Sequence, residues 1–183
     1  MDIGLFPISA KPFHEAHYKM IEIAAMENHA VIVIVSLTDR VRKEEFPIYG
    51  KDMALIWRDH ISKILPSNVS MLYLTSSPIK KTYEILGSAE KDGQQNQYKI
   101  YGDIDDTQKN FQYNMLERYY PRLSMSNLIT LCSYDRKDIK EISGTMMRAF
   151  LSSNNKEMFI QNLPDGIDKE FVYSTLLNGN KSS

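Results

Sequence analysis

A continuous apolar run at residues 30–37 is the sequence feature that most constrains the fold. It reads Ala-Val-Ile-Val-Ile-Val-Ser-Leu and does not alternate between apolar and polar side chains. Such a short β-branched run is typical of a strand whose two faces are both buried, as in a parallel sheet covered by helices. A first strand at residues 3–6 and a helix at 15–27, with apolar side chains at helical spacing, precede it. Two strands joined by a helix of this length predict a right-handed βαβ unit.

The same alternation continues to the end of the chain. Further strands are predicted at residues 69–75, 98–101 and 128–132. Further helices are predicted at residues 52–65, 79–86 (capped by Gly87), 144–151, 154–161 and 168–177. Residues 88–97 are polar and predict a loop, and residues 107–120 are compatible with a helix or with irregular structure.

This pattern indicates one α/β domain over residues 1–177. We expect a Rossmann-like, doubly wound parallel sheet of about five strands with helices on both faces. Residues 178–183 are expected to be a frayed tail. Ligands of such sheets bind beyond the carboxyl ends of the strands, where the strand order reverses.

Composition excludes several classes of protein. The formal net charge is -1, so the chain lacks the strong basicity typical of a protein that binds nucleic acid. Cys132 is the only cysteine, which excludes an intramolecular disulfide and a cysteine metal site, and its apolar neighbours indicate a core residue. No segment approaches the ~18 apolar residues of a membrane helix, and the N-terminus does not resemble a secretory signal. We therefore expect a cytoplasmic location, with neither nucleic acid nor membrane as partner.

Residues 6–17 predict a phosphate-binding turn. Phe6 and Pro7 end the first strand, and Lys11, His14 and His17 follow where the helix begins. A helix N-terminus attracts phosphate through its free N–H groups and its dipole. His14 and His17 are three residues apart and therefore share one helical face. Alone, this stretch is also compatible with solvated histidines and an ordinary loop lysine.

A second stretch, residues 143–148, predicts another phosphate-binding site at a helix start. Ser143 and Thr145 stand at a predicted helix start, where serine and threonine also serve as ordinary caps. Arg148 lies one turn further on the same face, and its forked guanidinium suits a terminal phosphate.

Charged residues also follow two other strands. Gly102 and Asp103 come after the fourth strand, and the acidic turn they begin could touch Mg²⁺ or simply be solvated. Arg40 and Arg42 come after the second strand and could bind an anionic second substrate. Because Glu44 and Glu45 follow, a solvated, charge-balanced loop is the alternative reading of this segment.

Together the two stretches resemble the nucleotidyltransferase superfamily marked by HxGH and SxTxxR signatures. Residues 12–17 read Pro-Phe-His-Glu-Ala-His, with Ala16 in place of the signature glycine, and residues 143–148 read Ser-Gly-Thr-Met-Met-Arg. The superfamily includes cytidylyltransferases, pantetheine-phosphate adenylyltransferases and nicotinamide-nucleotide adenylyltransferases. The chain is more closely similar to uncharacterised bacteriophage members, in which a lysine precedes the proline as Lys11 precedes Pro12.

The resemblance implies transfer of a nucleoside monophosphate, with AMP from ATP as the first choice, to a small phosphorylated acceptor with release of pyrophosphate. It implies Mg²⁺ held mainly by phosphates and water, without a protein-only metal site. Relatives often form homo-oligomers. The implied residues are Lys11, His14, His17 and Arg148 for catalysis, and Phe6, Pro7, Gly102, Asp103, Ser143 and Thr145 for the nucleotide; Arg40 and Arg42 would take the acceptor.

Two alternatives stay open. A cytidylyltransferase that uses CTP would need the same residues. A nucleotide-binding protein without turnover is the alternative from another class, and Ala16 motivates it because a methyl group could crowd the nucleotide where glycine allows close approach.

Overall fold

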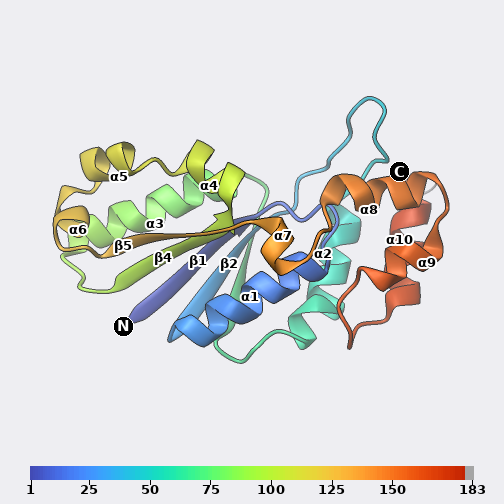
Figure 1. Ribbon diagram of the computed structural model, residues 1–183, viewed down its shortest axis with the longest axis horizontal. Helices are drawn as coiled ribbons and strands as arrows, with labels where there is room; N and C mark the ends of the chain where they lie inside the picture. Colours follow the sequence, from blue (N-terminus) through green and yellow to red (C-terminus); the bar gives the residue numbers. More distant parts are fainter. Residues whose placement is uncertain (180–183) are drawn as a thin grey trace.

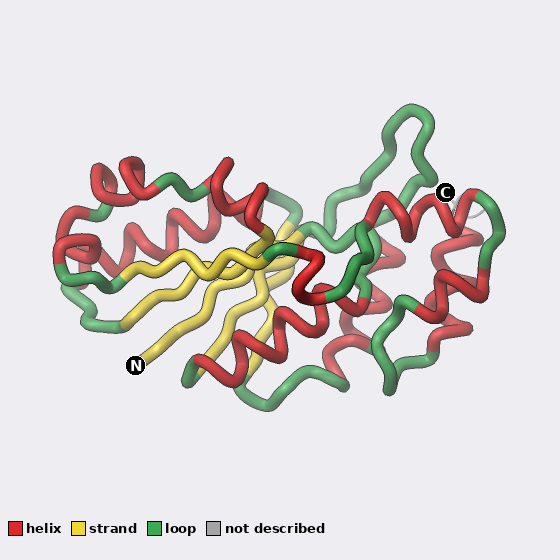
Figure 2. The backbone as a smooth tube through the Cα atoms, in the orientation of Figure 1, coloured by secondary structure: helices red, strands yellow, loops and turns green. Residues whose placement is uncertain are grey.

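A five-stranded, fully parallel sheet forms the centre of the protein (Figures 1 and 2). The computed structural model describes residues 1–179. The strand order is β3-β2-β1-β4-β5. The strands are β1 (Asp2–Ile8), β2 (Ala30–Ser36), β3 (Val69–Leu74), β4 (Gln97–Asp103) and β5 (Ile129–Tyr134). The predicted doubly wound α/β fold is therefore confirmed.

Helices cover both faces of the sheet and also extend beyond its carboxyl edge. Figure 1 shows α3 to α6 along one face and α1 along the other, with α8, α9 and α10 grouped past the strand ends. The helices are α1 (Glu15–Glu27), α2 (Gly50–Asp59), α3 (Pro78–Asp92), α4 (Ile104–Asn110), α5 (Tyr113–Tyr119), α6 (Pro121–Met125), α7 (Arg136–Ile139), α8 (Gly144–Ser152), α9 (Lys156–Gln161) and α10 (Lys169–Asn178). Among residues 1–179, no helix is both long enough and apolar enough to cross a membrane.

The central strands separate two hydrophobic cores. In β1, Leu5 belongs to the core under α3 and α6, whereas Phe6 belongs to the core that includes α1, α2 and α8. In β2, Val31, Val33 and Val35 are fully buried in the latter core. Burial on both faces explains why residues 30–37 carry apolar side chains without alternation.

Helix α3 is longer than predicted, and the prediction that Gly87 caps it was wrong. The helix begins with Ser77, whose Oγ accepts from the backbone N–H of Lys80, and it continues to Asp92. Gly93, at φ 66°, is the capping residue. Residues 88–92 are therefore helical rather than a loop, because Leu86 and Ala89 both pack into the core and outweigh the low helix propensity of Gly87.

Other boundaries also differ from the prediction. Strands β1, β4 and β5 continue to Ile8, Asp103 and Tyr134, beyond the predicted ends at residues 6, 101 and 132. The helix expected at 52–65 ends at Asp59, and a 3-10 turn over Ile61–Lys63 follows it. The ambiguous segment 107–120 holds α4 and α5, which are separated at Phe111 by non-helical backbone. Helix α10 extends to Asn178, and residues 180–183 of the predicted frayed tail lie outside the described residues.

Candidate functional site

A pocket of about 370 Å³ opens at the carboxyl edge of the sheet, between β1 and β4. This is the point where the strand order reverses, since β1 pairs with β2 on one side and with β4 on the other. Its volume is within the range of small-molecule sites. Every predicted site residue except Arg42 lines the pocket. The predicted residues that line it are Phe6, Pro7, Lys11, His14, His17, Arg40, Gly102, Asp103, Ser143, Thr145 and Arg148. Arg42 is exposed on the loop between β2 and α2, which projects from the body in Figure 1.

The two histidines stack against each other at the start of α1. Their ring centroids are 3.7 Å apart, and the backbone N–H of His14 donates to Nδ1 of His17 over 3.2 Å. Because Nδ1 of His17 accepts a hydrogen bond, the proton of the neutral ring is on Nε2. Nδ1 of His14 is buried and has no partner among the described residues. Both histidines line the pocket, so a ligand bound there would lie against their rings.

Burial keeps both histidines neutral. Desolvation, followed by the nearby charge of Arg136, lowers the pKa of His17 to about 3. Desolvation also holds the pKa of His14 well below its ordinary value, with smaller contributions from His17 and Arg136. At neutral pH the rings are therefore uncharged, and the positive charge of the pocket comes from other residues.

Ala16 does not distort the helix that carries the histidines. Its side chain is 3% exposed and packs in the core with Phe13 and Met20, although the residue also contributes to the pocket lining. Helix α1 is continuous from Glu15 through this position. The methyl group that replaces the signature glycine is thus mostly accommodated by the core.

Lys11 ties the loop after β1 to the end of β2. Its Nζ donates to the carbonyl oxygens of Ser9 (3.0 Å) and Ser36 (2.5 Å). The side chain is buried, and desolvation, followed by repulsion from Arg40, lowers its pKa to about 8. Lys11 is still mostly protonated at pH 7, so it supplies a fixed positive charge.

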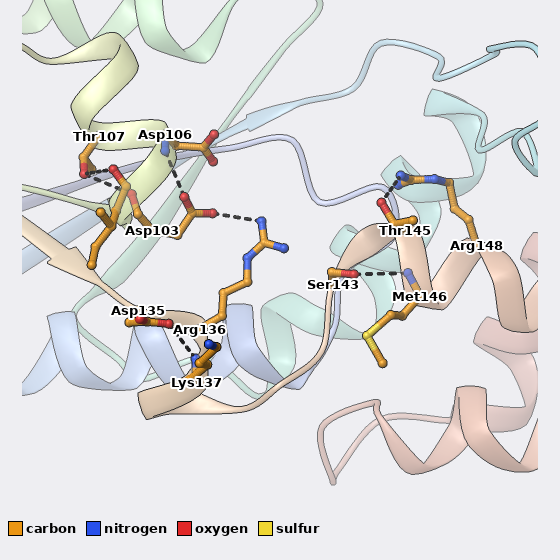
Figure 3. A network of polar contacts seen from close by, with 11 residues as sticks. Asp103, Asp106, Thr107, Asp135, Arg136, Lys137, Ser143, Thr145, Met146 and Arg148 are labelled. Atoms are coloured by element: carbon orange, nitrogen blue, oxygen red, sulfur yellow. Dashed lines mark hydrogen bonds and ion pairs between the residues drawn. The ribbon is translucent and has the colours of Figure 1, made fainter.

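Arg148 joins the two predicted stretches. Its Nη1 donates to the backbone carbonyl of Lys11 over 2.6 Å, across 137 positions of sequence, and its Nη2 donates to Oγ1 of Thr145 over 3.2 Å. Ser143 caps α8 by accepting from the backbone N–H of Met146 (Figure 3). A Cβ on Gly144 would lie 2.8 Å from Nη1 of Arg148, so the guanidinium occupies space that only glycine leaves open.

Glu45 connects Arg40 to Arg148. Its carboxylate accepts from Nε and Nη2 of Arg40 over 2.8 and 3.0 Å, and Oε2 lies 3.6 Å from Nε of Arg148. The hydrogen bond from Arg40 lowers the pKa of Glu45. Arg40, Arg148 and Lys11 therefore form one positive cluster, although Arg40 was predicted to serve a second substrate.

Asp103 organises the other end of the pocket. It caps α4, because Oδ1 accepts from the backbone N–H of Asp106 over 2.9 Å, and Oδ2 accepts from Nη2 of Arg136 over 3.0 Å (Figure 3). These hydrogen bonds outweigh desolvation and lower the pKa of Asp103, whereas desolvation and the neighbouring Asp103 raise that of Asp106.

Sequence reasoning missed Arg136, which lines the pocket from α7. Its position directly after the fifth strand was the signal that could have identified it, because parallel strands end at the same edge. Pro78, Ile79, Asn110 and Phe111 also line the pocket without having been predicted.

Comparisons with known proteins agree with the fold. No family model matches the chain, and a search of curated proteins likewise finds no match. Among solved structures, a provisionally assigned nicotinate-nucleotide adenylyltransferase from Vibrio parahaemolyticus superposes with a TM-score of 0.60 at 16% identity, covering 97% of this chain and 99% of that chain. TmcAL from Thermotoga maritima, bound with alpha-thio ATP, superposes with a TM-score of 0.50 at 12% identity. This match covers 99% of this chain and 56% of that chain.

Structural similarity at such low sequence identity is evidence about the backbone fold alone. It covers nearly the whole chain in both comparisons. The protein therefore shares its backbone fold with these two solved structures.

Proposed function

We propose that this protein is a nucleotidyltransferase that transfers AMP from ATP to a small phosphorylated acceptor and releases pyrophosphate. The observation that carries the proposal is the hydrogen bond from Arg148 to the carbonyl of Lys11. It brings the lysine–histidine stretch and the Ser143–Arg148 stretch to one pocket at the switch point of the sheet. The fold shared with a provisionally assigned adenylyltransferase supports the same reaction class.

The proposed step is a single in-line displacement. An oxygen of the acceptor phosphate attacks the α-phosphorus of ATP, the new phosphoanhydride bond forms, and the bond to the β-phosphate oxygen breaks. The acceptor phosphate is already ionised at neutral pH, so the step needs no general base. Catalysis of this kind depends on positioning and on stabilising negative charge on the phosphoryl oxygens.

The residues of the pocket suit these tasks. His17 would donate from Nε2 to the α-phosphate, and His14 would support the same group. Lys11, Arg40 and Arg148 would neutralise the β- and γ-phosphates together with the free N–H groups at the start of α8. Their positive charges would also stabilise the pyrophosphate as it leaves.

Mg²⁺ fits this pocket as an ion that arrives with the triphosphate. The described residues contain no group of three or more histidine, cysteine, aspartate or glutamate side chains that could hold a metal ion. Of the two carboxylates that line the pocket, Asp103 is already paired with Arg136, which leaves Asp106 as the side chain available to touch a hydrated ion. The ion would reduce the negative charge of the triphosphate while phosphate oxygens and water fill most of its coordination sphere.

The test is pyrophosphate release over a matrix of ATP, CTP, GTP and UTP against phosphorylated acceptors, with products identified by mass spectrometry. Nicotinate mononucleotide, nicotinamide mononucleotide and phosphopantetheine belong in the first panel. We expect release with ATP and one acceptor class. Binding of a nucleoside triphosphate without pyrophosphate release from any pair would contradict the proposal and favour a silent nucleotide-binding protein.

Two variants examine the assigned residues. We expect Arg148→Gln and His17→Gln each to lower kcat/KM by about 10²-fold or more, as loss of one charge-stabilising donor does elsewhere. Arg118→Gln is the matched control, since Arg118 is an exposed arginine on α5 outside the pocket lining. Full activity in both site variants would refute the assignment of the pocket.

A further inference from the structure

We propose that Arg136 binds the phosphate of the acceptor and holds it on the side of the pocket opposite the pyrophosphate site. This inference rests on the proposed nucleotidyl transfer and extends it to the second substrate. Arg136, the proposed acceptor-binding residue, lies outside both signatures. Arg40 is assigned to the triphosphate rather than to the acceptor.

The distribution of positive charge is the first argument. Three of the four lysine and arginine side chains that line the pocket lie at one end: Glu45 contacts both Arg40 and Arg148, and Arg148 donates to the carbonyl of Lys11. A triphosphate with its several negative charges matches this cluster. An acceptor phosphate bound at the same cluster would compete with the triphosphate instead of attacking it.

Arg136 is the fourth cation, and it lies apart from the others. It comes from α7 and reaches Asp103 at the end of β4, so it belongs to the β4–β5 side of the sheet. Figure 3 shows its side chain extending toward Asp103, with Ser143, Thr145 and Arg148 on the other side of the view. The side chain lines the same pocket as the histidines, and its charge contributes to the lowered pKa of both His14 and His17.

The geometry of displacement is the second argument. The attacking and leaving oxygens lie on opposite sides of the phosphorus that is transferred. If pyrophosphate leaves toward the Lys11, Arg40 and Arg148 cluster, the attacking phosphate must approach from the other side. Arg136 is the one lining cation, among the described residues, that this side offers.

Arg136 is also free to change partner. Its guanidinium makes one hydrogen bond within the described part of the chain, to Asp103, and half of its side chain is exposed. Water reaches the Arg136 half of this pair although Asp103 is mostly buried, so a doubly charged phosphate can approach the guanidinium and replace the single carboxylate. The remaining N–H donors match two of the three terminal oxygens of a phosphate monoester. Asp103 would therefore hold Arg136 in place until the acceptor arrives.

The test separates binding of the two substrates. Isothermal titration would measure α,β-methylene-ATP alone, and ribose 5-phosphate as a simple phosphate monoester in the presence of saturating α,β-methylene-ATP. For Arg136→Gln we expect monoester affinity to fall at least about ten-fold, as for a lost charged hydrogen bond, with little change for the nucleotide analogue. Arg148→Gln should weaken the nucleotide analogue instead.

Two further variants make the test specific. Lys137→Gln removes the same charge from the same short helix outside the pocket lining, and it should leave both affinities unchanged. Asp103→Asn keeps an oxygen that can cap α4 but removes the charge that holds Arg136, so monoester binding should become several-fold tighter. A purely structural role of the ion pair predicts no such gain.

The possible failures are distinguishable. If Arg136→Gln weakens the nucleotide analogue and leaves the monoester unchanged, or if the wild type binds no monoester, the assignment of Arg136 is overturned. If the wild type does not bind α,β-methylene-ATP at all, the proposed function fails first.

Discussion

Gly144 offers a sharp test of how the pocket positions Arg148. A Cβ at this position would lie 2.8 Å from Nη1 of Arg148 and 3.4 Å from the carbonyl oxygen of Lys11. The oxygen belongs to the backbone, whereas the guanidinium is the end of a flexible side chain, so the guanidinium is the group that moves. We therefore expect Gly144→Ala to break the 2.6 Å hydrogen bond that joins the two signatures.

The magnitude follows from the bond that is lost. A hydrogen bond to a charged group contributes about 1.5–3 kcal/mol, which corresponds to roughly a 10- to 150-fold loss of kcat/KM if Arg148 acts from this position. Folding stability should change less, because alanine is favoured over glycine in a helix by about 0.5–1 kcal/mol and so offsets part of the loss. The expected signature is a roughly 10- to 150-fold kinetic effect together with a loss of about 0.5–2.5 kcal/mol in the free energy of unfolding.

The assay pairs pyrophosphate-release kinetics with urea unfolding and uses Gly87→Ala as control. Gly87 lies inside α3, and a Cβ there would meet only Tyr120, at an ordinary 3.8 Å. The control should be more stable by about 0.5–1 kcal/mol and fully active. Wild-type kcat/KM and nucleotide affinity in Gly144→Ala would refute the idea that this glycine positions Arg148.

Two pH-dependences follow from the same pocket. Folding lowers the pKa of His14 and His17 below the unfolded value of about 6.5, so the unfolded chain binds more protons below that pH. The free energy of unfolding should therefore decrease as the pH drops below about 6.5, by at most about 1.4 kcal/mol per pH unit for each histidine. Urea unfolding between about pH 7.5 and pH 5 checks this, and an equal slope in His17→Gln would contradict it. For Lys11, with a pKa of about 8, kcat/KM should fall as pH rises through that value, because the pocket loses a positive charge that it offers to the triphosphate. A kcat/KM profile that stays flat up to about pH 9.5 would exclude a catalytic charge on Lys11.

Local patterns predicted the fold well because they report burial and backbone preference. The unbroken apolar side chains of β2 predicted a strand covered on both faces, and apolar spacing predicted α1 with the bounds that the structure shows. The prediction failed where packing decided the outcome. Gly87 looked like the end of a helix, yet Leu86 and Ala89 belong to a hydrophobic core that includes residues of β4 and α6, later in the chain, and α3 stays helical through Asp92.

The residues of the candidate site were likewise predictable in part from local sequence and in part only from tertiary structure. The sequence by itself determined which residue types stand after each strand, and the parallel order of the strands is enough to bring those residues to one edge. Only the tertiary structure decided how they group, because hydrogen bonds between distant loops leave no periodic trace in the sequence. In the folded protein Arg148 donates a hydrogen bond to the carbonyl of Lys11, and Glu45 contacts both Arg40 and Arg148. Arg42 lies outside the pocket. Arg136 pairs with Asp103 at the opposite end of the pocket.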